Sequence, residues 1–182
     1  HGLRLAATFR GVLSCADCPA ARYHLDLWAD NVFHPRRQWL ERGPMRDDLG
    51  RWRYAPARRA LILTGGAEMP LQFQVIGPNE LRQLDLQGNP IDSPLDYGLR
   101  SDGTLTPTEL ATFCAGELRY LADAASFTEC LTGRRYPVAF EADWPSAESA
   151  YLAAVAEPGG LLHTTFEGQL VERPKMDGEG TQ

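Results

Sequence analysis

Residues 21 to 100 alternate between apolar and polar side chains with the two-residue period of β-strands. Tyr23, Leu25 and Leu27 form one apolar face, for example, and the residues between them form a second face. The strands expected from this pattern span residues 23–28, 32–41, 50–54, 60–64, 71–76, 81–86 and 96–100. Pro35 has no amide hydrogen to donate, so it predicts a sheet edge or a break in pairing. Short strands separated by Gly, Pro, Asn and Asp turns predict an antiparallel β-barrel or β-sandwich.

The polar segment 101–110 separates this block from a second one and is expected to be a linker. Within it, Thr106 and Glu109 have the spacing of a helix-capping pair, which predicts a short helical turn. Residues 111–182 contain three strand-like segments, one helix that ends at Pro158-Gly159-Gly160, and a further strand. This is most of the element order of an OB-fold, with the fifth strand missing. We therefore expect a mainly β protein with domains at residues 1–100 and 111–182.

The formal net charge of −6 argues against an overall cationic nucleic-acid-binding protein. No apolar run is long enough to cross a membrane as a helix. Residues 1–100 carry 13 basic and 11 acidic side chains, a net charge of +2, whereas residues 101–182 carry 5 and 13, a net charge of −8. Opposite signs would let the two domains attract each other or let each face a different partner. Seventeen arginines against one lysine permit an anion site in the first domain, although solvent-facing arginines are the simpler explanation.

Cys15-Ala16-Asp17-Cys18 holds two thiols close together, which suits a redox pair or half of a metal site. A structural zinc site needs four ligands, and the chain has no second C-x-x-C. A thioredoxin-like site needs a helix after the first cysteine, whereas Pro19 and a strand pattern follow here. Cu(I) fits better, because it accepts two or three soft thiolate or thioether ligands. A structural disulfide within the motif is the simpler alternative.

Cys114 and Cys130 lie at the two ends of an expected strand pair. A structural disulfide between them would close a loop of roughly 17 residues and contribute about 3 kcal/mol in the chain-entropy model. Two unpaired buried thiols, or a partner for Cys130 beyond Gln182, are the alternatives. The chain also has no G-x-S-x-G, H-E-x-x-H, P-loop or dinucleotide-binding motif, and we expect it not to be an enzyme.

The C-x-x-C lies within Leu13-Ser14-Cys15-Ala16-Asp17-Cys18. Further characteristic segments are residues 50–52, 84–91, 95–99, 120–130, 132–135, 149–154 and 166–168. In this order, and over nearly the whole chain, these segments resemble the NlpE family of envelope lipoproteins, which are linked to copper homeostasis and surface sensing. The family has proline where this chain has Ser14.

The resemblance implies a lipocalin-like β-barrel followed by a small OB-like barrel with one helix. It also implies an outer-membrane lipoprotein that faces the periplasm of a Gram-negative bacterium and signals envelope stress to a sensor kinase. The family's lipid-bearing cysteine is not in this sequence, so the chain is expected to be a soluble, trimmed form. Cys15 and Cys18 would be the metal- or redox-responsive pair, with copper as the candidate metal and no required cofactor. The family's OB-domain disulfide cysteine falls on Cys130, and its usual partner lies near the C-terminus.

Two alternative functions stay open. A lipocalin-like barrel permits binding of a small apolar or anionic ligand, with Arg36, Arg37, Arg51 or Arg53 at the barrel mouth. A thiol-disulfide oxidoreductase would use Cys15 as its nucleophile.

Overall fold

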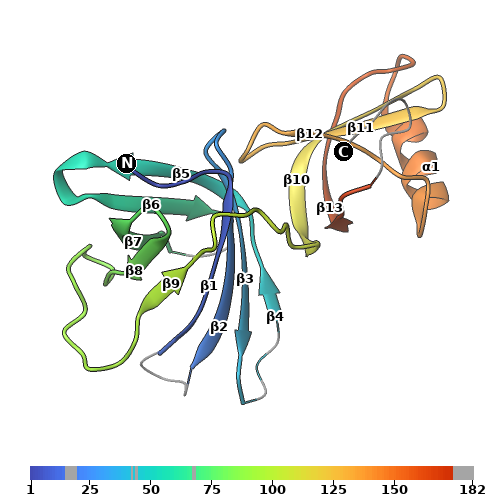
Figure 1. Ribbon diagram of the computed structural model, residues 1–182. Coiled ribbons are helices and arrows are strands. Elements are labelled where there is room, and N and C mark those ends of the chain that lie inside the picture. Colours follow the sequence, from blue (N-terminus) through green and yellow to red (C-terminus); the bar gives the residue numbers. More distant parts are fainter. Residues whose placement is uncertain (15–19, 42, 44, 67–68, 174–182) are drawn as a thin grey trace. The chain divides into compact units, whose positions relative to one another are not determined.

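The computed structural model describes residues 1–14, 20–41, 43, 45–66 and 69–173 (Figure 1). The chain divides into two compact units, His1–Thr112 and Phe113–Gln182. The domain boundaries expected from the sequence stay a prediction, since a division by compactness does not test a linker at residues 101–110.

The first unit is a β-barrel. Its strands are β1 (Ala7–Leu13), β2 (Ala21–Leu27), β3 (Val32–Trp39), β4 (Met45–Asp47), β5 (Gly50–Ala55), β6 (Ala60–Gly65), β7 (Leu71–Gly77), β8 (Glu80–Gln83) and β9 (Gly98–Arg100), with the short 3₁₀-helix η1 (Pro56–Arg58) between β5 and β6. The strand order is β2-β1-β9-β8-β7-β6-β5-β3-β4, and all pairs for which a register is given are antiparallel. Because β2 also pairs with β3, eight strands close into a barrel. The ninth strand, β4, pairs with the C-terminal part of β3.

Alternation along the strands fills the barrel interior with apolar side chains. Tyr23, Leu25 and Leu27 are buried in the barrel core, as the sequence predicts. Phe9 and Phe73 from other strands are completely buried in the same cluster. Small closed barrels are typically filled by side chains in this way. The core of this unit therefore lies inside the barrel.

Pro35 marks the point where β3 changes partners. On one side β3 pairs with β5 at Phe33, and on the other it pairs with β4 from Arg36 onward. Pro35 lies between these two pairings and accepts a hydrogen bond from the Asp48 amide at 3.2 Å. On its other side β3 pairs with β2 through Pro35 without interruption, so the predicted break in pairing is limited to the change from β5 to β4.

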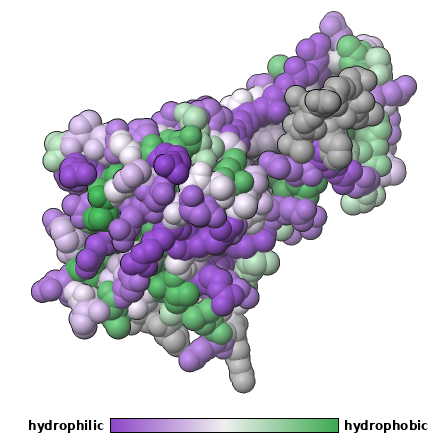
Figure 2. Space-filling model, in the orientation of Figure 1, coloured by the Kyte–Doolittle hydropathy of each residue, from purple (hydrophilic) through white to green (hydrophobic). Residues whose placement is uncertain are grey.

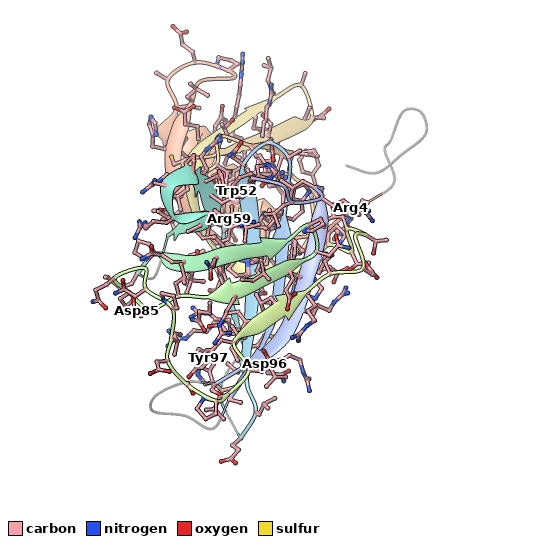
Figure 3. The ribbon with its side chains drawn as sticks, turned by 60° about the vertical axis from the view of Figure 1, so that its left-hand side comes forward. Arg4, Trp52, Arg59, Asp85, Asp96 and Tyr97 are labelled. Atoms are coloured by element: carbon pink, nitrogen blue, oxygen red, sulfur yellow. The ribbon has the colours of Figure 1, made fainter. Side chains whose placement is uncertain are left out.

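The connection from β8 to β9 is long and is organised by two aspartates near its ends (Figure 3). Asp85 Oδ1 accepts a hydrogen bond from the Asn89 amide at 2.7 Å, and this bond lowers the pKa of Asp85. Asp96 Oδ1 accepts one from the Gly98 amide at 2.8 Å, which lowers the pKa of Asp96 in the same way. Both aspartates therefore fix turns; Asp96 is exposed, and Asp85 is half-buried.

The C-terminal unit contains one sheet and one helix. Its elements are β10 (Leu110–Leu121), β11 (Ala124–Glu129), β12 (Arg135–Pro137), α1 (Trp144–Ala154) and β13 (Leu162–Leu170), with sheet order β12-β11-β10-β13. Tyr151 of α1 is completely buried, and its hydroxyl donates a 2.5 Å hydrogen bond to the Gly160 carbonyl. Three strands, a helix and a further strand confirm the expected OB-like order, and residues 113–173 contain no fifth strand.

The predicted helical turn at Thr106 is wrong. Residues 102–109 contain no helix, and the Thr106 amide donates to the Thr8 side chain on the outer face of the barrel instead. Contacts with a distant strand outweigh a local capping preference, which contributes only about 1 kcal/mol. Within the segment expected to be a linker, Thr104 and Thr106 are therefore hydrogen-bonded to Thr8 of β1.

Candidate functional site

The C-x-x-C lies between β1 and β2. Cys15 and Cys18 are outside the described residues. The flanking strands pair from Ala7–Leu27 to Leu13–Ala21. The segment that carries the two cysteines therefore leaves and rejoins the barrel at one end of the β1–β2 hairpin.

The adjacent arginines of β3 point to opposite faces of that strand. Arg36 makes a two-pronged ion pair with Asp47 of β4, at 2.7 and 2.6 Å, and this hydrogen-bonded pair raises the pKa of Arg36. Arg37 lies over the rings of Tyr23 and Trp39, 5.9 and 5.8 Å from their centroids. Tyr23 belongs to the barrel core, so Arg37 faces inward and Arg36 outward.

The arginines of β5 lie on the outer face of the barrel. Arg51 and Arg53 are exposed and alternate with the buried Gly50 and Trp52. Arg51 donates to the Asp30 carbonyl at 3.4 Å. The four arginines suggested as ligand contacts are thus distributed over two strands and both faces of the wall.

The disulfide expected between Cys114 and Cys130 is not formed, and both are free thiols. The register pairs Gly116 with Glu129, and the Cys130 amide donates to the Ala115 carbonyl at 2.9 Å. Cys130 is therefore opposite Ala115, and alternation directs Cys114 to the other face of the hairpin. Burial, with a contribution from the charge of Glu129, raises the pKa of Cys114 to about 11, whereas Cys130 is exposed.

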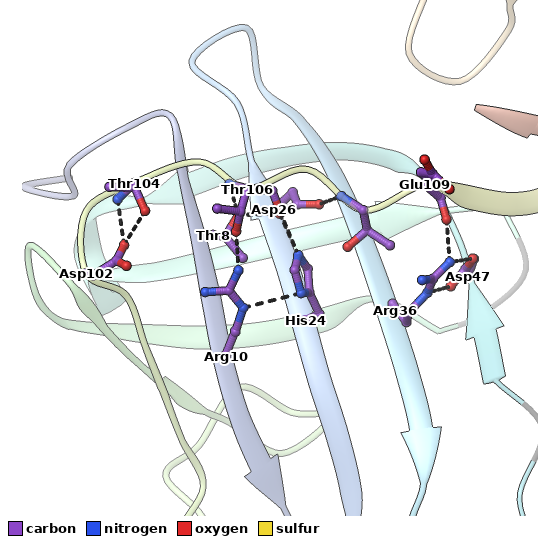
Figure 4. Close-up of polar contacts among 11 residues, drawn as sticks. Thr8, Arg10, His24, Asp26, Arg36, Asp47, Asp102, Thr104, Thr106 and Glu109 are labelled. Atoms are coloured by element: carbon purple, nitrogen blue, oxygen red, sulfur yellow. Dashed lines mark hydrogen bonds and ion pairs between the residues drawn. The ribbon is translucent and has the colours of Figure 1, made fainter. Parts of the chain in front are cut away.

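A row of polar side chains on the outer faces of β1 to β4 binds residues 104–111, and we call this set of contacts the polar seam (Figure 4). Its barrel residues are Thr8, Arg10, His24, Asp26, Arg36 and Asp47. The alternation of β2 predicts that Asp26 faces solvent, yet its exposed fraction is 0%. Residues 104–111 therefore cover a polar strip that the strand pattern alone marks as surface.

Asp26 is the most buried carboxylate of the polar seam. It accepts hydrogen bonds from the Thr8 hydroxyl at 2.5 Å and from the Thr108 amide at 2.9 Å. Nε2 of His24 lies 3.1 Å from Asp26 Oδ1 and 3.1 Å from the Thr106 carbonyl oxygen. These contacts satisfy a buried charge that would otherwise be costly.

The seam continues along the barrel on both sides of Asp26. Thr8 donates its amide to the Thr104 carbonyl at 2.8 Å and accepts the Thr106 amide at 2.9 Å. Further along, Asp47 accepts the Ala111 amide at 2.9 Å while it pairs with Arg36. Ala111 belongs to β10, so the seam ends where the first strand of the second sheet begins.

The sequence matches two family models, described as the NlpE N-terminal domain, over residues 9–94, and the NlpE C-terminal OB domain, over residues 107–182. This chain belongs to the NlpE family. It is 35% identical to lipoprotein NlpE of Escherichia coli (strain K12) over 170 residues, which are 88% of this chain and 69% of that protein. The family assignment expected from the sequence motifs is confirmed.

Two solved structures are also similar to this NlpE-family chain. The crystal structure of the Cpx pathway activator NlpE from E. coli is 30% identical and covers 93% of this chain and 86% of its own, with a TM-score of 0.40. A Shewanella oneidensis protein described as a lipoprotein is 28% identical and covers 56% of this chain and 93% of its own, with a TM-score of 0.49.

No residue of the polar seam belongs to the C-x-x-C motif at residues 15–18 of this NlpE-family chain. Among the described residues, no three or more His, Cys, Asp and Glu side chains gather as a metal-binding group. Within the same residues, no helix has the length and apolar composition needed to span a membrane.

Two residues of the polar seam fall differently on the family models. Thr104 lies between the two matched regions, and Thr108 lies in the second.

Proposed function

We propose that this chain is the periplasm-facing part of an outer-membrane lipoprotein that senses envelope stress. The observation that carries the proposal is the match of both NlpE family models in order, with the C-x-x-C inside the N-terminal match. Its E. coli relative is a lipoprotein and a Cpx pathway activator. By analogy, the partner of this chain is the sensor kinase of an envelope-stress pathway, and the chain is not an enzyme.

Within this proposal, Cys15 and Cys18 form a Cu(I)- or redox-responsive site in the barrel domain. Two nearby thiols supply the soft ligands that Cu(I) prefers. The β1–β2 hairpin that carries them also carries Thr8 and Asp26 of the polar seam. A domain of residues 1–100, a connection at 101–110 and an OB-like domain at 111–182 complete the proposed organisation.

Titration of the fully reduced chain with Cu(I), against a colorimetric Cu(I) chelator, tests the metal site. We expect the wild type to bind one Cu(I) more per chain than the Cys15→Ser/Cys18→Ser variant. Cys130→Ser removes the exposed thiol of the other unit and is the matched control, with wild-type stoichiometry expected. Equal stoichiometry in the wild type and the double variant would show that the C-x-x-C binds no copper. A reporter of envelope stress, measured in cells that express this chain with and without the sensor kinase, tests the proposed partner. We expect the reporter signal only in cells that contain the kinase.

The two alternative functions stay predictions. The barrel interior is occupied by side chains such as Phe9, Phe33 and Phe73, all nearly or fully buried. An insulin-reduction assay tests the oxidoreductase, and a ligand-binding screen with Arg37→Gln tests the binding module.

A further inference from the structure

An open hollow of about 360 Å³ lies on the C-terminal unit, between the β10–β11 turn and the end of α1. We call it the α1 groove. Its apolar lining includes Leu121, Leu152, Val155 and Pro158. Leu121 is 47% exposed and Leu152 is 58% exposed, so these two leucines present apolar surface to solvent. The volume is near the lower end of the range of ligand pockets, about 300–1,000 Å³, and suits a few side chains.

The solvent-exposed surface of α1 carries few charges. Leu152 and three alanines are exposed together with Ser146 and Ser149, and Glu148 is the only charged residue in the helix. In Figure 2, green and pale green side chains gather along α1. Helices on a free surface usually present charged or polar side chains to water. Exposed leucines beside a hollow, on a helix with one charged residue, are therefore typical of an interaction surface.

The rim of the α1 groove is negative. Asp123 and Glu157 line it, and none of the described residues that line the groove is an arginine or lysine. The last turn of α1 has no basic side chain, so its carbonyl ends add partial negative charge close to the groove. A hydrogen bond with Glu148, together with desolvation and the charges of Glu148 and Asp123, raises the pKa of Tyr120 to about 12. The whole C-terminal part of the chain is also acidic, since residues 101–182 carry a net charge of −8.

We propose that the α1 groove binds a basic, amphipathic segment of a partner protein. Its apolar side chains would pack on Leu121 and Leu152, and a lysine or arginine would face Asp123 and Glu157. Charge complementarity selects this occupant, because Asp123 and Glu157 would repel an acidic segment and attract a basic one. The proposal does not depend on the Cys15–Cys18 site, so a negative Cu(I) titration leaves it intact.

An NMR titration of the full chain with three synthetic 12-residue peptides tests the proposal. The first peptide combines leucine and lysine, the second replaces lysine with glutamate, and the third replaces leucine with serine. We expect only the first peptide to shift the amide signals of residues 121–123 and 152–157. Raising the salt concentration should weaken its binding, because the charges at the rim are exposed to solvent.

Two variants at equally exposed leucines distinguish peptide binding in the groove from binding to any exposed apolar side chain. Leu152→Ser should weaken binding of the leucine–lysine peptide at least fivefold, and Leu161→Ser should leave it within twofold. Both leucines are 58% exposed, but only Leu152 lines the groove. Asp123→Asn combined with Glu157→Gln should remove most of the salt dependence.

Three results of the peptide titrations would overturn the proposal. They are equal binding of the glutamate peptide, binding that is unchanged by Leu152→Ser, and shifts that map away from the groove. Saturable, concentration-dependent shifts of the same amides without peptide would also overturn it, because the occupant would then be a second copy of this chain.

Discussion

Removal of the Asp26 carboxylate should destabilise the barrel and release residues 104–111. In Asp26→Ala, the Thr8 hydroxyl and the Thr108 amide lose their charged acceptor, and His24 loses its neighbour. Hydrogen bonds to charged groups contribute about 1.5–3 kcal/mol each. Removing Asp26 also removes the cost of burying its charge, which offsets part of the loss. We therefore expect a net loss of about 3 kcal/mol in the free energy of unfolding of the first unit.

Urea unfolding followed by amide NMR signals separates the two units. With a urea m-value of about 1.5 kcal/mol/M, a loss of this size lowers the midpoint of the first unit by about 2 M. Hydrogen exchange reports the local effect, and we expect the Thr108 amide to lose its protection before the amides of β6 do. Signals of the second unit should keep their midpoint.

Asp92→Ala is the matched control, because Asp92 is an exposed aspartate of the same unit. Its substitution should change the free energy of unfolding by less than about 0.5 kcal/mol. An Asp26→Ala midpoint within error of the Asp92→Ala midpoint, with unchanged Thr108 exchange, would refute the role given to the polar seam.

Three further predictions concern the free thiols and two carboxylates. Cys130 should react with iodoacetamide at least tenfold faster than Cys114 at neutral pH, by peptide mass spectrometry, because burial keeps Cys114 protonated; equal rates would contradict this. Glu129→Ala should destabilise the second unit by about 2 kcal/mol in urea, since Glu129 is 1% exposed and accepts two amides and a hydroxyl of the following turn; an unchanged midpoint would count against it. The Thr104 hydroxyl and amide hold the pKa of Asp102 below its usual value, so its stabilisation is complete above the unfolded-state pKa and is lost as the pH falls through the lower folded-state pKa. Thr104→Val should raise that pKa in a carboxyl NMR titration, and an unchanged value would argue against this cause.

Alternation predicts most strands of the barrel because every second side chain of a strand, usually an apolar one, enters one closed interior. It misses β1, whose inward positions include the small residues Ala7 and Gly11 and so give a weak apolar signal. Gly11 is small for a physical reason, since a Cβ there would lie 2.4 Å from the Gly98 carbonyl oxygen of β9. The three residues of β4 are too few to display any period.

The polar seam cannot be predicted from local sequence patterns, because most of its contacts join residues far apart in the chain. Asp26 and Thr108 are 82 positions apart, and Arg36 and Asp47 meet only through the register of β3 with β4. The same holds for Cys114 and Cys130, whose spacing permits a disulfide while the hairpin register places them on opposite faces. Sequence spacing limits which groups can meet, and strand register decides which ones do.

The polar seam and the C-x-x-C lie at different positions along the same hairpin, which lets the two be tested independently. Thr8 pairs with Asp26, and Leu13 next to the C-x-x-C pairs with Ala21. Leu13 is five positions along β1 from Thr8, a distance of about 17 Å. Asp26→Ala should therefore release residues 104–111 without changing the number of Cu(I) ions bound per folded chain. If Cu(I) instead changes the exchange of the Thr108 amide in the wild type but not in Cys15→Ser/Cys18→Ser, the hairpin transmits the state of the cysteines to the segment that leads into β10. Identical exchange with and without Cu(I) would show that the two sites act separately.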